Sequence, residues 1–265
     1  MEYLLRARKS IRRKLLRAPR LYLALDYDGT LTRIVNDPEH ALLPKRTKEL
    51  LQSIAAKNRC FLIIVSGRRV VDLIKLVDID RAYYVGNHGL EIRGPGYRFV
   101  GHNGAKKLSH CLPELSRKLN QRLFATGAVL ENKGLTLSVH YRNVRRSSIP
   151  VVLSTVRQIL QDYDMFGAIF DKKVIDIRPN LAWNKGSALE VLRQHLGRYP
   201  MVYIGDDRTD EDAFVKLKDA LTVLVSCRPR SSGASYYLKS TRDVAVFLRL
   251  FNSWIQETYG RFDRS

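Results

Sequence analysis

The chain has 265 residues, 45% of them hydrophobic and 27% charged, which is ordinary for a soluble globular protein and allows a large domain with a smaller insertion. No apolar run approaches the length of a membrane span, and the first residues, MEYLLRARKS, lack the apolar segment of a signal peptide. The 3 cysteines are widely spaced, with no CxxC pair. They indicate reduced thiols, and we expect a cytoplasmic protein.

The net charge of +20 raises the question of an anionic partner, but its distribution argues against nucleic acid. Residues 1–20 hold eight lysines and arginines against the single acid Glu2, and the remaining excess is spread thinly. No zinc-finger spacing and no RNA-binding aromatic signature accompanies it. We therefore expect no nucleic-acid partner, whereas a weak contact of residues 1–20 with an anionic surface stays open.

The first predicted element is an amphipathic helix over residues 3–18. Leu4, Ile11 and Leu15 fall on one stripe, and Pro19 ends the helix. Such a helix either lies on a membrane surface or docks on its own domain. No motif lies in it, so we expect it to be dispensable for chemistry, with deletion altering solubility or surface binding more than turnover.

From Leu21 onward, buried strands alternate with helices. The predicted elements are strand 21–25, an irregular loop 32–43, a helix opened by Pro44, strand 60–65, helix 69–77 and strand 82–85. Three such βα units with short connections predict a parallel, doubly wound sheet of the Rossmann-like α/β class.

Between about residues 94 and 179 the order of elements changes to α+β. We expect a helix over 105–124, strands at 128–131 and 135–141, a helix over 149–163, and strands at 168–170 and 174–177. The α/β rhythm then resumes with a helix capped by Asn184, strand 201–204, a helix with a Thr209–Asp212 capping box, strand 221–225 and helix 241–258. The sequence therefore predicts a core domain of residues 1–93 and 180–265 with an inserted domain of residues 94–179.

Polar side chains follow the ends of the predicted parallel strands or open the next helix. They are Asp26, Asp28, Ser66, Lys185, Asp206, Asp207 and Asp210. Strand ends of a parallel sheet meet at one edge, where carboxylates together with a phosphate suit Mg²⁺. An aspartate beside such a cation and a lysine can attack phosphorus to form an aspartyl-phosphate, and a second carboxyl can serve as acid and then base.

Several strings of the sequence resemble one known group of enzymes. Asp26-x-Asp28-Gly29-Thr30, Ser66, Lys185 and Asp206 resemble the motifs of haloacid dehalogenase-like phosphatases. The strings LDYDGTL, VSGR, GNHGLE, ENKGLTLSVHYR, IRPNLAWNKG and GDDRTDEDAF look like the trehalose-6-phosphate phosphatase family over about residues 21–250. The resemblance implies a Rossmann-like core with an inserted α+β cap, and Mg²⁺-dependent hydrolysis of trehalose 6-phosphate to trehalose and phosphate.

The resemblance also implies roles for individual residues. Asp26 would be the nucleophile and a metal ligand, and Asp28 the acid and base, with its backbone carbonyl on the metal. Ser66 would bind the phosphoryl oxygens and Lys185 would neutralise their charge. The implied metal residues are Asp26, Asp28, Asp206, Asp207 and Asp210, and the implied substrate-binding residues are Thr30, Arg68, Asn87, His88, Glu131, Lys133, His140, Arg142 and Asp176. Asp176 departs from the family, which more often has glutamate there.

Other interpretations compete with this one. The substrate could be another sugar phosphate, such as a glycosyl-phosphoglycerate or sucrose phosphate, or the chain could be a phosphomannomutase-like phosphotransferase. A regulatory protein that kept the fold and lost the chemistry is disfavoured because the core catalytic residues are all present. Ser66 could simply cap a helix, His88 could stabilise a turn, and Glu131 with Lys133 could be a surface ion pair.

Overall fold

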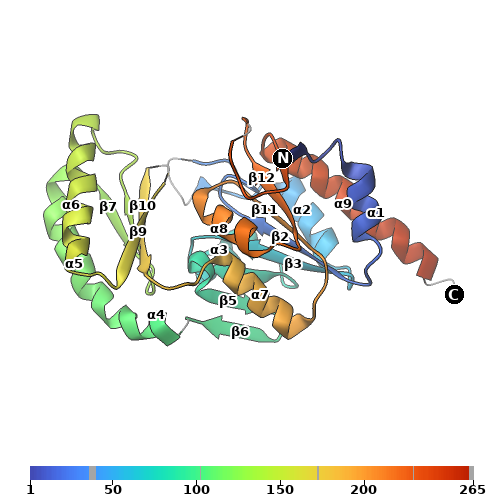
Figure 1. The fold of residues 1–265 in the computed structure, drawn as a ribbon, viewed down its shortest axis with the longest axis horizontal. Coiled ribbons are helices and arrows are strands. Elements are labelled where there is room, and N and C mark those ends of the chain that lie inside the picture. The colour runs from blue at the N-terminus through green and yellow to red at the C-terminus, as the bar shows by residue number, and fades with distance from the viewer. Residues whose placement is uncertain (36–39, 102, 172, 229, 263–265) are drawn as a thin grey trace. The chain divides into compact units, whose positions relative to one another are not determined.

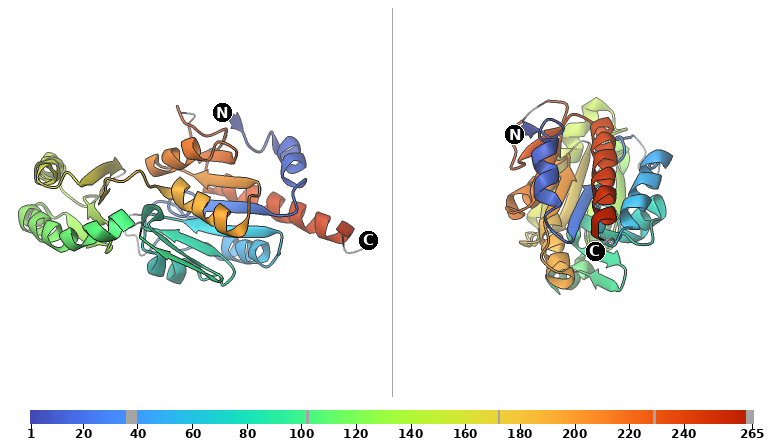
Figure 2. Two further views of the ribbon diagram at one scale, coloured as in Figure 1. Left: turned by 60° about the horizontal axis from the view of Figure 1, so that its bottom comes forward. Right: turned by 90° about the vertical axis from the view of Figure 1, so that its right-hand side faces the viewer.

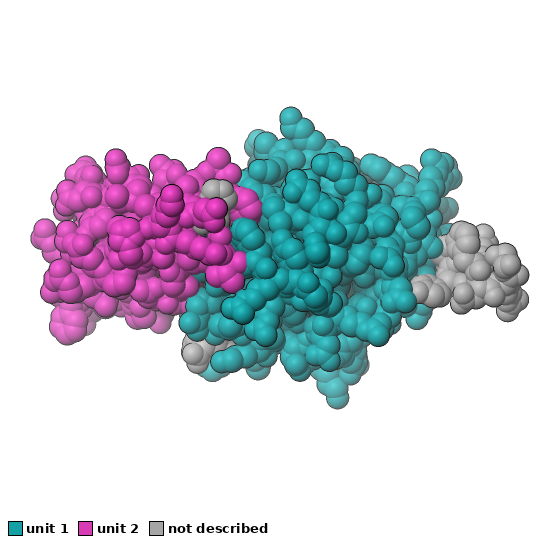
Figure 3. Space-filling view, turned by 90° about the horizontal axis from the view of Figure 1, so that it is seen from below, with its two compact units in different colours: residues 1–99, 184–265 teal, residues 100–183 magenta. Residues whose placement is uncertain are grey.

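The computed structural model describes residues 1–35, 40–101, 103–171, 173–228 and 230–262, so part of the predicted loop 32–43 lies outside the described residues. The chain forms two compact units (Figure 3). Unit 1 consists of Met1–Phe99 and Asn184–Ser265, and unit 2 of Val100–Trp183.

A nine-stranded sheet forms the centre of unit 1 (Figure 1). In spatial order its strands are β1 (Glu2–Tyr3), β13 (Tyr236–Leu238), β12 (Leu221–Val225), β11 (Met201–Gly205), β2 (Leu21–Asp26), β3 (Cys60–Val65), β4 (Tyr83–Gly86), β5 (Glu91–Gly94) and β6 (Tyr97–Val100). All pairs from β1 to β4 are parallel, whereas β5 runs antiparallel to β4. The predicted parallel, doubly wound core is confirmed.

Helices cover both faces of this sheet (Figures 1 and 2). Successive residues of β2 alternate between two apolar clusters, with Leu23 in one and Ala24 in the other, and every residue of β2 is buried. The Leu23 side packs against α1 (Arg8–Leu15), α2 (Lys45–Ala55), α3 (Val70–Val77) and α9 (Thr241–Phe262), and the Ala24 side against α7 (Lys185–Leu196) and α8 (Arg208–Lys216). This two-sided burial explains the unbroken apolar run that precedes Asp26.

The N-terminal segment belongs to this core, and its helix is shorter than the sequence suggests. Tyr3 pairs with Tyr237 in a parallel strand, so the helix is confined to α1. Ile11 and Leu15 are each 2% exposed and lie in the same cluster as α9, beside which α1 runs in Figure 2. Arg59 donates to the backbone oxygens of Leu16 and Ala18 at 2.8 and 2.7 Å and fixes the end of the helix. Within the described residues, no helix is long and apolar enough to cross a membrane.

Unit 2 has the α+β order that the sequence predicts. Its antiparallel sheet is built of β7 (Val129–Asn132), β8 (Leu137–His140), β10 (Val174–Pro179) and β9 (Phe166–Asp171), in that spatial order. Leucines of α5 (Leu112–Leu123) and valines of α6 (Ile149–Gln161) pack on the apolar side of this sheet. The predicted single helix 105–124 is wrong. It is divided into α4 (Asn103–Leu108), a 3-10 turn (Ser109–Cys111) and α5, because Pro113 lacks the N–H that a continuous helix requires.

The boundaries between the units also differ from the sequence expectation. Gly94-Pro95-Gly96 is the turn of the hairpin β5–β6, and this hairpin extends the core sheet. The chain therefore passes from unit 1 to unit 2 between residues 99 and 100, whereas the sequence predicted this boundary between residues 93 and 94. It passes back to unit 1 between residues 183 and 184, whereas the prediction was between residues 179 and 180. The short strands β1 and β13 were likewise not predicted.

Candidate active site

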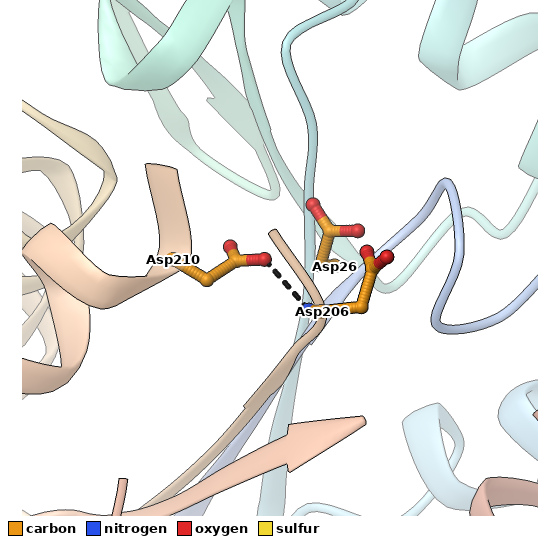
Figure 4. Close-up of side chains that lie close together, drawn as sticks. All are labelled: Asp26, Asp206 and Asp210. Atoms are coloured by element: carbon orange, nitrogen blue, oxygen red, sulfur yellow. Dashed lines mark hydrogen bonds between the residues drawn. The ribbon is translucent and has the colours of Figure 1, made fainter. Parts of the chain in front are cut away.

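Asp26 is the last residue of β2 and forms the centre of a buried acidic cluster (Figure 4). Its neighbours in the sheet are β11, which ends just before Asp206, and β3, which ends just before Ser66. Carboxylate oxygens of Asp26, Asp206 and Asp210 lie within 4.8 Å of one another. The predicted convergence of strand-end carboxylates is therefore present for these three residues.

Lys185 supplies positive charge to this cluster. It is the first residue of α7, whose N-terminus is fixed by a reciprocal capping box between Asn184 and Ser187. Its ammonium is 2.8 Å from Asp26 Oδ1 and 2.8 Å from Asp210 Oδ1, and the residue is 2% exposed. Burial opposes the charged form, but the surrounding carboxylates outweigh it and raise the pKa of Lys185, so it stays an ammonium.

Asp210 is hydrogen-bonded to several other members of the cluster. Its Oδ2 accepts hydrogen bonds from the backbone N–H groups of Asp206 at 2.8 Å and Asp207 at 3.1 Å. Its Oδ1 accepts from Lys185 at 2.8 Å and from the hydroxyl of Tyr203 at 2.5 Å. Burial raises the pKa of Asp210 to about 6. With both oxygens engaged in this way, Asp210 holds the Asp206 and Asp207 backbone, Lys185 and Tyr203 in place, and its predicted support of a metal stays a prediction.

Asp207 caps α8, which corrects the predicted Thr209–Asp212 capping box. The Asp207 backbone is extended, and its carboxylate accepts from the N–H of Asp210 at 3.0 Å and from the Thr209 hydroxyl at 2.8 Å. Thr209 thus lies inside the first turn, two residues later than a capping residue. Burial opposes the charged carboxylate of Asp207, but Lys185 and these hydrogen bonds lower its pKa to about 2.

The donor set of the cluster fits a hard divalent cation. All candidate ligand atoms are oxygens, which Mg²⁺ prefers. Burial raises the pKa of Asp26, and the nearby carboxylates raise it further against the opposing charge of Lys185. The cluster contains three carboxyl groups beside the single ammonium of Lys185, so a bound cation would offset charge that the lysine alone leaves unbalanced. A Cβ at Gly29, where φ is +88°, would lie 2.3 Å from Asp206 Oδ2. Only glycine therefore lets the backbone after Asp28 approach Asp206 so closely.

Asp28 and Ser66 lie on the same edge of the sheet. The guanidinium of Arg68 donates to both carboxylate oxygens of Asp28, at 2.8 and 2.7 Å. Ser66 is buried, and its Oγ accepts from the N–H of Arg68 at 3.1 Å. Arg68 therefore fixes the direction of the predicted acid and base, a contact that its prediction as a substrate-binding residue did not include. The hydroxyl of Thr30 is buried and makes no hydrogen bond within the described part of the chain.

Asn87 and His88 form a strained turn against the same edge. Both have positive φ, at 51° and 56°, which is unfavourable for residues other than glycine. The N–H of Asn87 donates to the Arg68 carbonyl at 2.6 Å, and that of His88 to the Ser66 carbonyl at 3.3 Å. A Cβ at Gly67 would lie 2.6 Å from the His88 ring. The turn thus holds the Ser66-Gly67-Arg68 backbone, while the predicted contacts of Asn87 and His88 with substrate stay predictions.

The predicted sugar-binding residues of unit 2 lie together on its sheet. Glu131, Ser138 and Asp176 are direct cross-strand partners on β7, β8 and β10. Lys133 Nζ is 3.8 Å from a carboxylate oxygen of each acid, and His140 Nε2 is 2.9 Å from Glu131. Asp176 also accepts a short hydrogen bond from Ser138.

Lys133 is buried, which differs from a solvated surface ion pair. Its position follows from the turn at Asn132, whose side chain accepts from the N–H of Gly134 at 2.8 Å. Arg142 is half-buried just beyond β8.

Sequence reasoning missed two residues that contact the cluster. The Tyr203 hydroxyl reaches Asp210, although the residue reads as one more apolar position of a buried strand. Arg230 donates to the backbone oxygen of Asp206 at 3.0 Å from a loop with no recognisable motif. No local pattern distinguishes either residue, because each contact depends on the tertiary fold.

The fold and the cluster together define a class of protein. A parallel, doubly wound sheet that brings Asp-x-Asp, a serine, a lysine and further aspartates to one edge is typical of haloacid dehalogenase-like phosphatases. The family model described as Trehalose-phosphatase matches residues 24–242 of the chain. The protein belongs to this family of phosphoric monoester hydrolases.

Named relatives agree with this assignment. "Probable trehalose-phosphate phosphatase H" of Arabidopsis thaliana is 35% identical over 89% of this chain and 73% of its own length. "Trehalose-phosphate phosphatase B" of the same plant is 34% identical over 91% of this chain and 68% of its own. The solved C-terminal domain of the Candida albicans trehalose-6-phosphate phosphatase has a TM-score of 0.80 at 22% identity, covering 93% of this chain and 96% of that one, and therefore shows a shared fold.

Proposed function

We propose that the protein hydrolyses trehalose 6-phosphate to trehalose and phosphate with the help of Mg²⁺. The observation that carries this proposal is the buried cluster in which Lys185 contacts Asp26 beside Asp206. The family and the names of the relatives support trehalose 6-phosphate over sucrose phosphate, a glycosyl-phosphoglycerate or a mutase substrate.

In this proposal Asp26 attacks phosphorus, so that a bond from its carboxylate oxygen to phosphorus forms as the bond to the sugar oxygen breaks. Asp28 gives the leaving sugar oxygen a proton. It then takes a proton from the water that attacks the aspartyl-phosphate and releases phosphate and free Asp26. Lys185 stabilises the charge on the phosphoryl oxygens, and the hydroxyls of Thr30 and Ser66, both buried residues, would donate hydrogen bonds to these oxygens.

The residues that would hold Mg²⁺ are Asp26, Asp206 and the backbone carbonyl of Asp28, with Asp207 and Asp210 supporting them. When bound, the ion offsets the repulsion between the anionic nucleophile and the anionic phosphate. Arg68 holds the Asp28 carboxylate in place through two hydrogen bonds, so one of these bonds must be released before that oxygen can carry the proton that it gives to the leaving group.

Unit 2 is the proposed cap, with Glu131 and Lys133 as the residues that recognise the sugar. The core cluster treats any phosphate monoester alike, so discrimination between sugars must come from contacts remote from phosphorus. Asp176 already binds Ser138 and faces Lys133. Aspartate is shorter than the glutamate that the family more often has at this position. Asp176 would therefore contribute to sugar recognition indirectly, by holding Lys133 in place.

The test is phosphate release from a panel of sugar phosphates and p-nitrophenyl phosphate, with Mg²⁺ and after chelation. We expect the highest kcat/KM with trehalose 6-phosphate and loss of turnover on chelation, restored by added Mg²⁺. Preference for another sugar phosphate would overturn the substrate. Transfer of phosphate to a second sugar position would favour the mutase alternative, and no release from any ester would favour a regulatory protein.

A weak contact with anionic surfaces is a separate proposal, favoured by the outer face of α1. Its apolar side is sealed in the core, so its exposed cations can act only electrostatically and not by insertion. The Lys9→Gln/Arg13→Gln protein should bind anionic vesicles less than wild type in low salt. Lys45→Gln/Arg46→Gln, which removes two cations of α2 that are also exposed, is the matched control. Equal losses in both would contradict a contact through residues 1–20. The cytoplasmic location stays a prediction from the cysteine pattern.

A further inference from the structure

Tyr203 is a fully buried tyrosine whose hydroxyl points into the acidic cluster. Its ring packs edge-on against Phe214 of α8, with 5.6 Å between the ring centres. Its Oη donates a 2.5 Å hydrogen bond to Asp210 Oδ1. A Cβ at Gly205 would lie 2.3 Å from Asp210 Cγ, so the glycine allows Asp210 to lie directly against β11. Phe214 thus fixes the ring of Tyr203, and the close approach at Gly205 fixes the carboxylate of Asp210.

The oxygen that accepts the tyrosine hydroxyl is the one that binds Lys185. Asp210 Oδ1 is 2.8 Å from Lys185 Nζ, and the same ammonium is 2.8 Å from Asp26 Oδ1. The other oxygen of Asp210 is occupied by two backbone N–H groups and cannot rotate away without breaking both bonds. Tyr203 and Lys185 therefore donate hydrogen bonds to the same oxygen, Asp210 Oδ1, whose position is fixed.

Loss of the tyrosine hydroxyl would leave Lys185 as the one remaining donor to Asp210 Oδ1 among the described residues. An oxygen that is fully buried beside an ammonium attracts that remaining donor more strongly once its second donor is removed, because burial screens the attraction only weakly. Lys185 would then lie closer to Asp210 and farther from Asp26. Its charge would be displaced from the position where the phosphoryl group gains charge during transfer.

We propose that Tyr203 is a positioning residue, which holds Lys185 between Asp210 and Asp26 by occupying part of Asp210 Oδ1. It touches neither substrate nor metal and acts through Asp210. The proposal rests on phosphoryl transfer at Asp26, but it is independent of which sugar the enzyme prefers.

The variant that tests this is Tyr203→Phe, which keeps the ring in the core and removes only the hydroxyl. Tyr22→Phe is its matched control, since Tyr22 is also fully buried, lies on the neighbouring strand β2 and donates a 2.6 Å hydrogen bond to the Gly197 carbonyl. Each variant loses one tyrosine hydrogen bond, part-buried and to a carbonyl at Tyr22, buried and to a carboxylate at Tyr203, so thermal unfolding should report the larger loss for Tyr203→Phe. Of the two hydroxyls, that of Tyr203 shares its acceptor oxygen with Lys185, whereas that of Tyr22 reaches only the far end of the helix that Lys185 begins.

With p-nitrophenyl phosphate, Tyr203→Phe should lower kcat about tenfold or more while KM changes less than about twofold, because the lysine acts mainly on charge gained in the transition state. Binding of orthovanadate, which mimics that state, should weaken by a similar factor in calorimetry. Tyr22→Phe should retain wild-type kcat and vanadate affinity.

Wild-type kcat and vanadate affinity in folded Tyr203→Phe would overturn the proposal, as would equal losses in both tyrosine variants. Should wild type hydrolyse no phosphate ester, the proposed function fails separately. A crystal structure of Tyr203→Phe then decides the positioning role. A longer distance from Lys185 Nζ to Asp26 than in wild type supports it, and an unchanged distance refutes it.

Discussion

Truncation of Leu15 to alanine tests whether the N-terminal helix is part of the core. The Leu15 side chain is buried in the cluster that contains α9, so its loss leaves a cavity that the surrounding side chains fill only in part. Leu→Ala changes in protein cores cost about 2–5 kcal/mol. We expect about 3 kcal/mol, since α1 covers the outside of the sheet and can relax in part. For a chain of this size that corresponds to a fall in Tm of roughly 6–12 °C.

Differential scanning calorimetry measures this change, with Arg13→Ala as control. Arg13 lies on the exposed side of the same helix, and its replacement should cost less than about 0.5 kcal/mol. Turnover of Leu15→Ala well below its Tm should stay within about twofold of wild type, since α1 has no contact with the acidic cluster among the described residues. An unchanged Tm would refute the packing argument, and a large fall in kcat in the folded variant would refute the separation of this helix from the chemistry. Deletion of residues 1–20 should accordingly destabilise the fold, beyond the altered solubility that the sequence suggests.

Two further predictions concern unit 2 and the pH dependence of stability. Glu131→Gln keeps an acceptor for His140 but removes the negative charge. The kcat/KM for trehalose 6-phosphate should therefore fall roughly tenfold, while p-nitrophenyl phosphate is hydrolysed as by wild type. Equal losses with both substrates would make Glu131 a structural residue. The hydrogen bonds from Arg193 lower the pKa of Asp219, so the stability they contribute is present at neutral pH and is lost as the pH falls below about 4 and through the lowered folded-state value. Because the Asp219 side chain is 60% exposed, Asp219→Asn should cost at most about 1 kcal/mol at pH 7 and nothing in strong acid, and an equal difference in Tm at both pH values would contradict this.

The sequence predicts those parts of the fold that local patterns determine. The buried run at Cys60–Val65 is a strand with the predicted bounds, because a strand covered on both faces must be apolar throughout. The Asp26–Asp206 convergence also follows, because the ends of parallel strands share one edge. The family resemblance is confirmed by the match to residues 24–242.

The parts that were missed depend on tertiary contacts. The local pattern of Gly94-Pro95-Gly96 predicts only the end of an element. It forms a hairpin turn because the edge of β4 is available to pair with β5. Thr209 and Asp207 both suit a capping position, and the backbone conformation at the end of β11 decides for Asp207. The hydroxyl of Tyr203 has no signature, because its partner Asp210 comes from the following helix.

The central claim is that Asp26 carries out phosphoryl transfer from trehalose 6-phosphate. The most direct test is phosphate release from this substrate by Asp26→Asn, compared with wild type in the presence of Mg²⁺. The amide keeps the shape of the side chain but is a poor nucleophile and a poor Mg²⁺ ligand, so the variant should fold and show no turnover above background. Phosphate release near the wild-type rate by folded Asp26→Asn would contradict the mechanism.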